Sequence, residues 1–194
     1  MNRHRKSLLL IACSLFCSAA WAQSPRPLPL PNLSAPGPVA VYAMAAAPDG
    51  GVVIAGDFQE IQGLQRRGLA KLLANGTVDP DWNPILGGSN PVAASLAIDS
   101  NGDVFVGGSF TTVDGLPRDR IAKLDAAGEV YGSWNPGAGA GVNALAIDSV
   151  GGHLYVGGTY ASIAGQTRAG LARVSTATGA LDGVWTPELN EGAG

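Results

Sequence analysis

Apolar residues in this chain come in short runs separated by turns rich in glycine, aspartate and asparagine. The apolar run at residues 52–55 follows Asp49-Gly50, and the run at 104–106 follows Asn101-Gly102-Asp103. Asn-Gly and Asp-Gly between apolar runs are strong hairpin signals, because primed turns need positive φ at their central residues. Between residues 39 and 187 no stretch keeps a helical period. The pattern therefore predicts an all-β fold.

The same order of residues occurs three times along the chain. Trp82, Trp134 and Trp185 lie 52 and 51 positions apart, and each follows a glycine by six positions. Self-similarity at a fixed period is the mark of a repeat architecture. We divide residues 39–187 into three copies, 39–91, 92–140 and 141–187.

Each copy predicts four short antiparallel strands. The first two strands are apolar and joined by a glycine turn. The third strand alternates apolar and charged residues, as in Ile121-Ala122-Lys123-Leu124, which is typical of a half-solvated strand. The fourth strand is short and ends at the tryptophan. Four-stranded units of about fifty residues in tandem predict a β-propeller segment of three blades. A single blade cannot bury both faces, so we expect the three tryptophans to form the core between blades. We expect the repeat-matched arginines to stack on them or to bond backbone carbonyls: Arg66, Arg118 and Arg168.

The repeat resembles the delta-60 repeat of bacterial secreted and surface proteins. The resemblance rests on Ala-Leu-Ala-Ile-Asp (144–148), Val-Gly-Gly-Ser-Phe (106–110), Gly-x-x-Arg (115–118), Ile-Ala-Lys-Leu (121–124) and Trp-Asn-Pro (134–136), and it covers residues 39–187. It implies a propeller-like fold without an assigned activity or ligand. The chain departs from the family in carrying tryptophan where phenylalanine is usual, and Ala55-Gly56 in place of a glycine pair. Residues 124–128 also resemble the start of the blade-docking pattern of some quinone-cofactor propellers, but the tryptophan follows two positions late, and the pattern concerns docking and not the cofactor.

Three blades do not close a ring, since closed propellers use roughly four to eight. Residues 188–194 parallel the connector at 136–141 that leads into the next copy, so we expect an incomplete ring. Two explanations stay open: further blades follow in the same chain, or copies of the chain associate. The first is favoured, because nothing resembles a terminal cap.

The N-terminus predicts export. Residues 1–22 have a basic start, an uncharged apolar stretch and Ala20-Trp21-Ala22, so we expect a signal peptide cleaved between Ala22 and Gln23. A lipobox-like segment ending at Cys13 is the weaker alternative. Residues 23–38 are rich in proline and predict an extended leader, with ordered structure beginning near Val39. We expect a secreted, periplasmic or cell-surface protein without membrane insertion after cleavage.

Composition removes several kinds of chemistry. Both cysteines lie inside the predicted signal peptide, and His153 is the one histidine beyond it, so thiol catalysis and multi-histidine metal sites are excluded. We expect His153 to be a solvated residue of a hairpin turn. The segment Asp99-Ser100-Asn101-Gly102-Asp103 partly matches a calcium loop but lacks its terminal glutamate, so a hairpin turn is favoured. The signal also holds three basic residues, so its removal makes the net charge more negative than −3 and argues against nucleic acid as a partner.

No catalytic, cofactor-binding or metal residues are predicted, and no cofactor. A ring of matched arginines binding an anion is a weaker alternative to a packing role. Specificity is expected in the loops at 59–65, 111–117 and 161–167, where the copies differ. The sequence predicts a non-enzymatic binding or structural module with an unknown protein or carbohydrate ligand, completed by further blades or by self-association. The alternative is the N-terminal propeller of a larger secreted enzyme whose catalytic residues follow residue 194.

Overall fold

The computed structural model describes residues 33–34, 39–148, 152–187 and 189. The predicted signal peptide, most of the predicted leader and all but Leu189 of the predicted connector lie outside these residues. The described part is all-β, as predicted, and it includes no helix of the length and apolarity that a membrane crossing requires.

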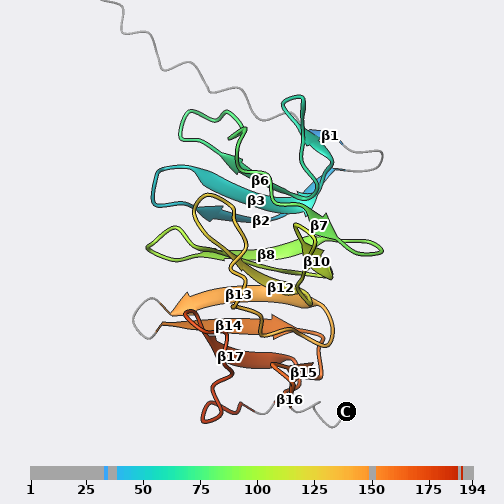
Figure 1. The fold of residues 1–194 in the computed structure, drawn as a ribbon, viewed down its shortest axis with the longest axis vertical. Coiled ribbons are helices and arrows are strands. Elements are labelled where there is room, and N and C mark those ends of the chain that lie inside the picture. The colour runs from blue at the N-terminus through green and yellow to red at the C-terminus, as the bar shows by residue number, and fades with distance from the viewer. Residues whose placement is uncertain (1–32, 35–38, 149–151, 188, 190–194) are drawn as a thin grey trace, which may run out of the picture.

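Three antiparallel sheets, one for each sequence copy, form the body of the molecule. Figure 1 shows them side by side along the long axis, with the first strands β2, β8 and β13 in the middle and the third strands β6 and β17 toward the two ends. Blade 1 consists of β2 (Ala40–Ala46), β3 (Val52–Asp57) and β6 (Leu69–Leu72), blade 2 of β8 (Ala93–Ile98), β9 (Val104–Gly108) and β12 (Ile121–Leu124), and blade 3 of β13 (Val142–Asp148), β14 (His153–Gly158) and β17 (Leu171–Ser175).

The fourth position of each blade is occupied by a single antiparallel bridge and not by an extended strand. These bridges join Leu72 to Val78, Leu124 to Val130, and Val174 to Leu181. Each lies after the glycine turn that the sequence places before the tryptophan. The expected four-stranded blade is thus realised as three laddered strands with a one-residue fourth partner.

Glycines at the ends of the second strands allow a close backbone approach. A Cβ on Gly56, Gly108 or Gly158 would collide with a carbonyl oxygen of the segment that enters the same blade, at Ala40, Val92 or Gly141. The first strand of each blade has a register irregularity near this point, between Val41/Ala43, Ala93/Ser95 and Val142/Ala144. Glycine is required here for space rather than for its φ angle.

The segments expected to be variable loops are short β-hairpins instead. They are β4–β5 (Glu60–Ile61, Leu64–Gln65), β10–β11 (Thr112–Val113, Leu116–Pro117) and β15–β16 (Ser162–Ile163, Gln166–Thr167). Both central residues of each turn have positive φ, as in Asp114 (50°) and Gly115 (77°), which matches the favoured two-residue hairpin turn. The Asp-Gly pair in the second copy was a sequence signal for this hairpin.

Each of these hairpins is extended by the chain that arrives from before its own blade. β1 (Leu33–Ser34) pairs with β4, β7 (Leu86–Gly87) pairs with β10, and Ala138 bridges to Ile163. Segments assigned to one sequence copy therefore belong structurally to the next blade. β1 also lies inside the predicted leader, so paired structure begins before Val39, contrary to expectation.

The apolar core lies between blades, as the tryptophans predicted. One cluster combines Val53, Leu69 and Trp82 of blade 1 with residues of blade 2 that include Val106 and Leu124. A second combines Phe105 and Trp134 of blade 2 with residues of blade 3 that include Leu154 and Val174. Trp82 and Trp134 are each 1% exposed, whereas Trp185 is only half-buried.

Candidate interaction surface

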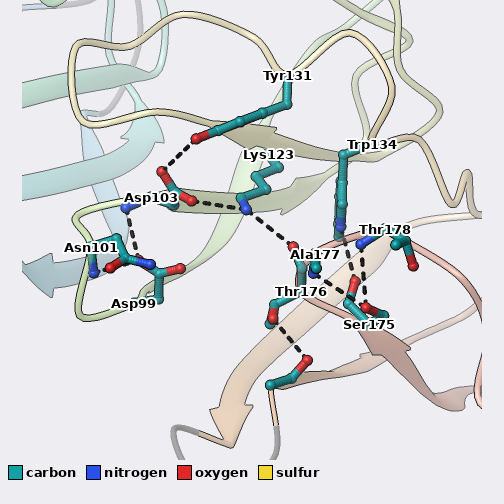
Figure 2. A network of polar contacts seen from close by, with 11 residues as sticks. Asp99, Asn101, Asp103, Lys123, Tyr131, Trp134, Ser175, Thr176, Ala177 and Thr178 are labelled. Atoms are coloured by element: carbon teal, nitrogen blue, oxygen red, sulfur yellow. Dashed lines mark hydrogen bonds and ion pairs between the residues drawn. The ribbon is translucent and has the colours of Figure 1, made fainter.

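A buried polar network joins blade 2 to blade 3 (Figure 2). The Lys123 Nζ on β12 lies 2.8 Å from the Asp103 Oδ2 and donates a hydrogen bond of 3.1 Å to the Thr176 carbonyl oxygen of blade 3. The Tyr131 hydroxyl donates to the other Asp103 oxygen at 3.0 Å, and the Lys123 ammonium lies 4.5 Å from the centre of the Tyr131 ring. Both charged residues are less than a tenth exposed. The ion pair is therefore anchored within blade 2 and bonded to blade 3.

This network corrects the expectation of a half-solvated third strand. Lys71 and Lys123, the charged residues of β6 and β12, are each 7% exposed because the following blade covers them. A buried charge needs a partner, and each lysine has one. Lys71 pairs with Asp49 at 2.7 Å, and hydrogen bonds from Lys71 and from the Gly51 N–H lower the pKa of Asp49.

Trp134 forms the second link between blades 2 and 3. Its ring packs edge-on against the Phe105 ring, with 5.3 Å between the ring centres. Its Nε1 donates a hydrogen bond of 3.0 Å to the Ser175 carbonyl oxygen (Figure 2). Trp82 also lies between blades 1 and 2, where a Cβ on Gly128 would come within 3.0 Å of its ring, but within the described residues its buried Nε1 has no hydrogen-bond partner. The repeated tryptophan thus reaches across to the glycine turn of the next blade.

Blade 3 carries the counterpart of this face, and no described blade covers it. The Arg173 Nε donates to the Asp182 Oδ2 at 2.9 Å, and its guanidinium lies 5.7 Å from the centre of the Trp185 ring. The Tyr155 ring packs edge-on against the Trp185 ring with 5.3 Å between the ring centres, as Phe105 packs against Trp134. Hydrogen bonds from Arg173, Val184 and Trp185 lower the pKa of Asp182 to about 2. We call Tyr155, Arg173, Asp182, Val184 and Trp185 the end face.

The end face is open to solvent within the described structure. Val184 is 92% exposed, and Arg173 and Trp185 are partly exposed where Lys123 and Trp134 are buried. An exposed aromatic and aliphatic surface beside an ion pair is typical of a protein contact. The end face is the candidate interaction surface of this chain.

His153 lies beside the end face and not in a turn, contrary to expectation. It is the first residue of β14 and pairs with Asp148 and Ser175 in the sheet. Its Nε2 is 4.0 Å from the Asp182 Oδ2, and its side chain is less than one-third exposed. Because Arg173 already bonds Asp182, we assign His153 a place at the edge of that ion pair.

The matched arginines bond backbone carbonyls, which confirms one of the two expected roles. The Arg66 Nη2 donates to the carbonyls of Asp79 and Pro80, and the Arg118 Nη2 donates to those of Tyr131 and Gly132. Both side chains are buried, and desolvation lowers both pKa values. Arg168 is partly exposed and bonds the Thr167 carbonyl. Arg66 and Arg118 hold the turn before the tryptophan in their own blade, a packing role.

The segment from Asp99 to Asp103 forms a hairpin turn, as favoured. The Asp99 Oδ1 accepts hydrogen bonds from the N–H groups of Asn101 (2.9 Å) and Asp103 (3.0 Å), and Gly102 has φ of 88°. The Asp103 carboxylate is engaged by Lys123 and Tyr131. Within the described residues no group of three or more histidine, cysteine, aspartate or glutamate side chains is placed to hold a metal ion.

An open groove of about 550 Å³ is lined by residues of blades 2 and 3 and of the connector between them. Its lining includes the polar side chains of Asp119, Asn135, Ser162 and Thr178, together with Arg120. Arg120 has a positive φ of 68°, and its guanidinium donates to the Ala138 carbonyl oxygen at 2.8 Å. Sequence reasoning missed this groove because it joins residues of two blades through the connector between them.

The repeat matches a known family. A sequence model of the family described as "Domain of unknown function (DUF5122) beta-propeller" matches residues 47–81, 100–130 and 152–183, which together make up half of the chain. The chain belongs to the DUF5122 β-propeller family. Each matched segment starts in or near the turn after a blade's first strand and ends shortly before its tryptophan, so the DUF5122 unit coincides with the blades seen in the structure.

Among solved structures, the Niastella koreensis GH74 enzyme is similar to this chain, with 19% sequence identity and a TM-score of 0.47. The match covers 72% of this chain and 20% of that enzyme, so the chain spans about a fifth of the enzyme's length. No curated protein matches the chain.

Proposed function

We propose that this DUF5122 chain is an exported, non-enzymatic module of the delta-60 type that binds further propeller blades through its end face. The observation that carries the proposal is the repetition of one interface. Lys123 and Trp134 each bond a backbone carbonyl of the next blade, and Arg173 and Trp185 occupy the same places at the open end.

The chemistry of the end face defines the partner. Trp134 requires a carbonyl acceptor from the turn that follows the third strand of the neighbouring blade, and Trp82 lies against a glycine of such a turn. A blade of the same repeat, in the same chain or in another copy, offers both. Buried aromatic residues supply much of the contact energy of interfaces, so Trp185 is expected to contribute most.

The mass of the chain from Gln23 in solution tests the partner. Light scattering after size exclusion distinguishes monomer from self-associated protein. If copies associate through the end face, Val184→Asp returns the protein to a monomer, because it places a charge in the contact. Ile85→Asp is the matched control, since Ile85 is half-exposed and lies away from the end face. Association that survives Val184→Asp would contradict the end face as the surface used.

The runner-up is the N-terminal propeller of a larger secreted enzyme. The end face would then hold the continuation of that enzyme instead of a plain blade. Incubation of the chain from Gln23 with a panel of chromogenic polysaccharides and esters tests the non-enzymatic part of the proposal alone, because the runner-up places its catalytic residues after residue 194 and also predicts no turnover by this chain. We expect no turnover; turnover that follows the protein through purification would overturn the non-enzymatic proposal.

A carbohydrate ligand is the second candidate, favoured by the polar groove between blades 2 and 3. Its open shape and its amide, hydroxyl and carboxylate lining suit sugar hydroxyl groups. A glycan array with the wild type and with Asp119→Ala/Asn135→Ala tests this reading. Binding lost in the double variant supports the groove; binding unchanged by it, or no binding at all, contradicts it.

A further inference from the structure

The junction between blades 2 and 3 holds two residues whose sizes are matched. Val142 on β13 is fully buried, and a Cβ on Gly107 of β9 would lie 2.5 Å from the valine Cγ1. Valine in the later blade thus fills the space that a side chain at position 107 would need. Because protein interiors are close-packed, this contact has room for only one of the two side chains.

The junction between blades 1 and 2 has the same two positions with a different pair of residues. Ala55 on β3 is the counterpart of Gly107, since each precedes the glycine that the entering segment contacts. Ala93 on β8 is the counterpart of Val142, since each pairs with that glycine in its own blade. Ala55 and Ala93 are both fully buried in one cluster. Where the earlier blade carries a Cβ, the later blade therefore has alanine in place of valine.

The two open ends of the molecule carry the glycine and the valine of such a pair. Gly157 in blade 3 is the counterpart of Gly107, and the described residues place only two atoms of Ala144, in the same blade, within 4 Å of a Cβ there. Val41 in blade 1 is the counterpart of Val142 and is 38% exposed. Within the described residues, the glycine therefore has open space beside it and the valine has no glycine to pack against.

A second match lies farther along the first strands. Leu96 of blade 2 lies in one cluster with Ala45 of blade 1. Met44 holds the position of Leu96 in the pairing of blade 1, and it is 71% exposed. Ala146 holds the position of Ala45 in blade 3, and it is exposed where Ala45 is half-buried. Ala146 also pairs with Tyr155, so the end face continues onto β13.

Val41 and Met44 form an exposed apolar surface on the first strand of blade 1, which we call the start face. Farther out, Ile54 on β3 and Ala70 on β6 are buried in a cluster of blade 1 itself, so the start face belongs to β2. Exposed apolar surfaces of this kind mark protein contacts. Methionine is unbranched and adapts to irregular gaps, which suits a contact between two separately folded chains.

We propose that the partner of the end face is a second copy of this chain, bound head to tail through its start face. Val41 of one copy then packs against Gly157 of the other, and Met44 packs against Ala146. This inference rests on the proposed binding of a blade at the end face and names the blade. Two chains of three blades, joined in this way at both junctions, make one ring of six blades, which lies within the roughly four to eight of closed propellers.

Cross-linking between two different single-cysteine variants tests the arrangement. The chain from Gln23 has no cysteine, so each variant carries one thiol. With a short bismaleimide, Met44→Cys mixed with ¹⁵N-labelled Ala146→Cys should give a mixed dimer that mass spectrometry identifies. Ile85→Cys is the matched control for Met44→Cys, because Ile85 is also exposed and lies outside both faces. We expect at least about a tenfold higher yield with Met44→Cys; equal yields, or none, would overturn the proposal.

Side-chain size tests the fitted pair, with the dimer dissociation constant measured by light scattering over a range of concentrations. Gly157→Ala has room within one chain but should weaken the dimer about tenfold, because the new Cβ meets the partner's Val41. Val41→Ala/Gly157→Ala should restore it, because alanine already matches alanine between blades 1 and 2. Gly132→Ala is the control, since nothing lies within 4 Å of a Cβ there.

The outcomes separate this inference from the proposed function. A dimer that Val184→Asp dissociates and Gly157→Ala leaves unchanged would refute the start face as partner and keep the end face as the binding surface. A dimer that neither variant weakens would contradict both. A wild-type chain that stays monomeric would overturn the second copy as partner and leave further blades of the same chain in that place.

Discussion

Lys123→Met should destabilise the fold more than any other single change to a charged residue in the described structure. The ammonium lies 2.8 Å from Asp103, a separation at which the gross attraction is about 6 kcal/mol at an effective dielectric constant of about 20. Desolvation of both charges offsets much of this attraction. Removing one partner of a buried pair nevertheless costs about 3–5 kcal/mol, because the other charge stays buried without its partner. We expect a loss near the lower value, since the Tyr131 hydroxyl still donates to Asp103.

The assay is urea unfolding followed by circular dichroism, and Lys71→Met serves as its control. Lys71 is as buried as Lys123, but the side chain of Asp49 is 53% exposed whereas that of Asp103 is 11% exposed. Water can therefore solvate Asp49 once its partner is gone, so Lys71→Met should cost about 1 kcal/mol. Asp103→Leu/Lys123→Met should recover about half of the loss, because no unpaired charge remains. Equal losses in the two lysine variants, or additive losses in the double variant, would refute the reasoning.

Three further results are expected. Gly108→Ala should lower Tm more than Gly115→Ala, because a Cβ at Gly108 would collide with a backbone oxygen. Gly115 has free space around it, so alanine there is disfavoured only by the φ of 77°, at a cost of about 1 kcal/mol. Thermal melts of the two variants compare these effects. Burial raises the pKa of Tyr160 to about 12, so stability present below about pH 10 should be lost between about pH 10 and 12, and Tyr160→Phe should abolish this loss in alkaline melts. The pKa of Asp182 is lowered to about 2, chiefly by Arg173, so its contribution is present above about pH 4 and is lost as the pH falls toward 2; Asp182→Asn should flatten Tm over this range, and an unchanged acid slope would contradict the ion pair.

Local chemistry let the sequence predict the hairpins of the blades. The turn at Asp99 to Asp103 has the Asx hydrogen bonds and the positive φ of Gly102 that its residues favour. The outer hairpin at Asp114-Gly115 carried the same signal, but the differing residues around it led to its assignment as a loop. The one-residue fourth position could not be foreseen, because the length of a ladder depends on how the neighbouring blade packs.

The burial of charge was the main point at which the sequence prediction failed. Lys123 alternates with apolar residues as a solvent-facing residue would, and its partner Asp103 lies in a turn of a different hairpin. The blade 1 lysine finds Asp49 at a different position in the turn, so no fixed spacing marks the pair. Only the stacking of the next blade turns this side of the strand into an interior.

The sequence by itself determined the repeat, the strands around its turns and the tryptophan core, because these follow from local hydrogen bonding and from the spacing of apolar residues. Only the tertiary structure shows why Gly108 has to be glycine, because a Cβ there would meet the carbonyl oxygen of Val92 in the segment that enters the blade. The tertiary structure alone decided which copies of a repeated residue are covered. Trp134 and Trp185 follow the same pattern, yet one is buried and bonded to blade 3 and the other lies on the end face. The physical reason is that a blade buries its apolar faces only against its neighbours, so the exposure of each residue depends on its place in the stack.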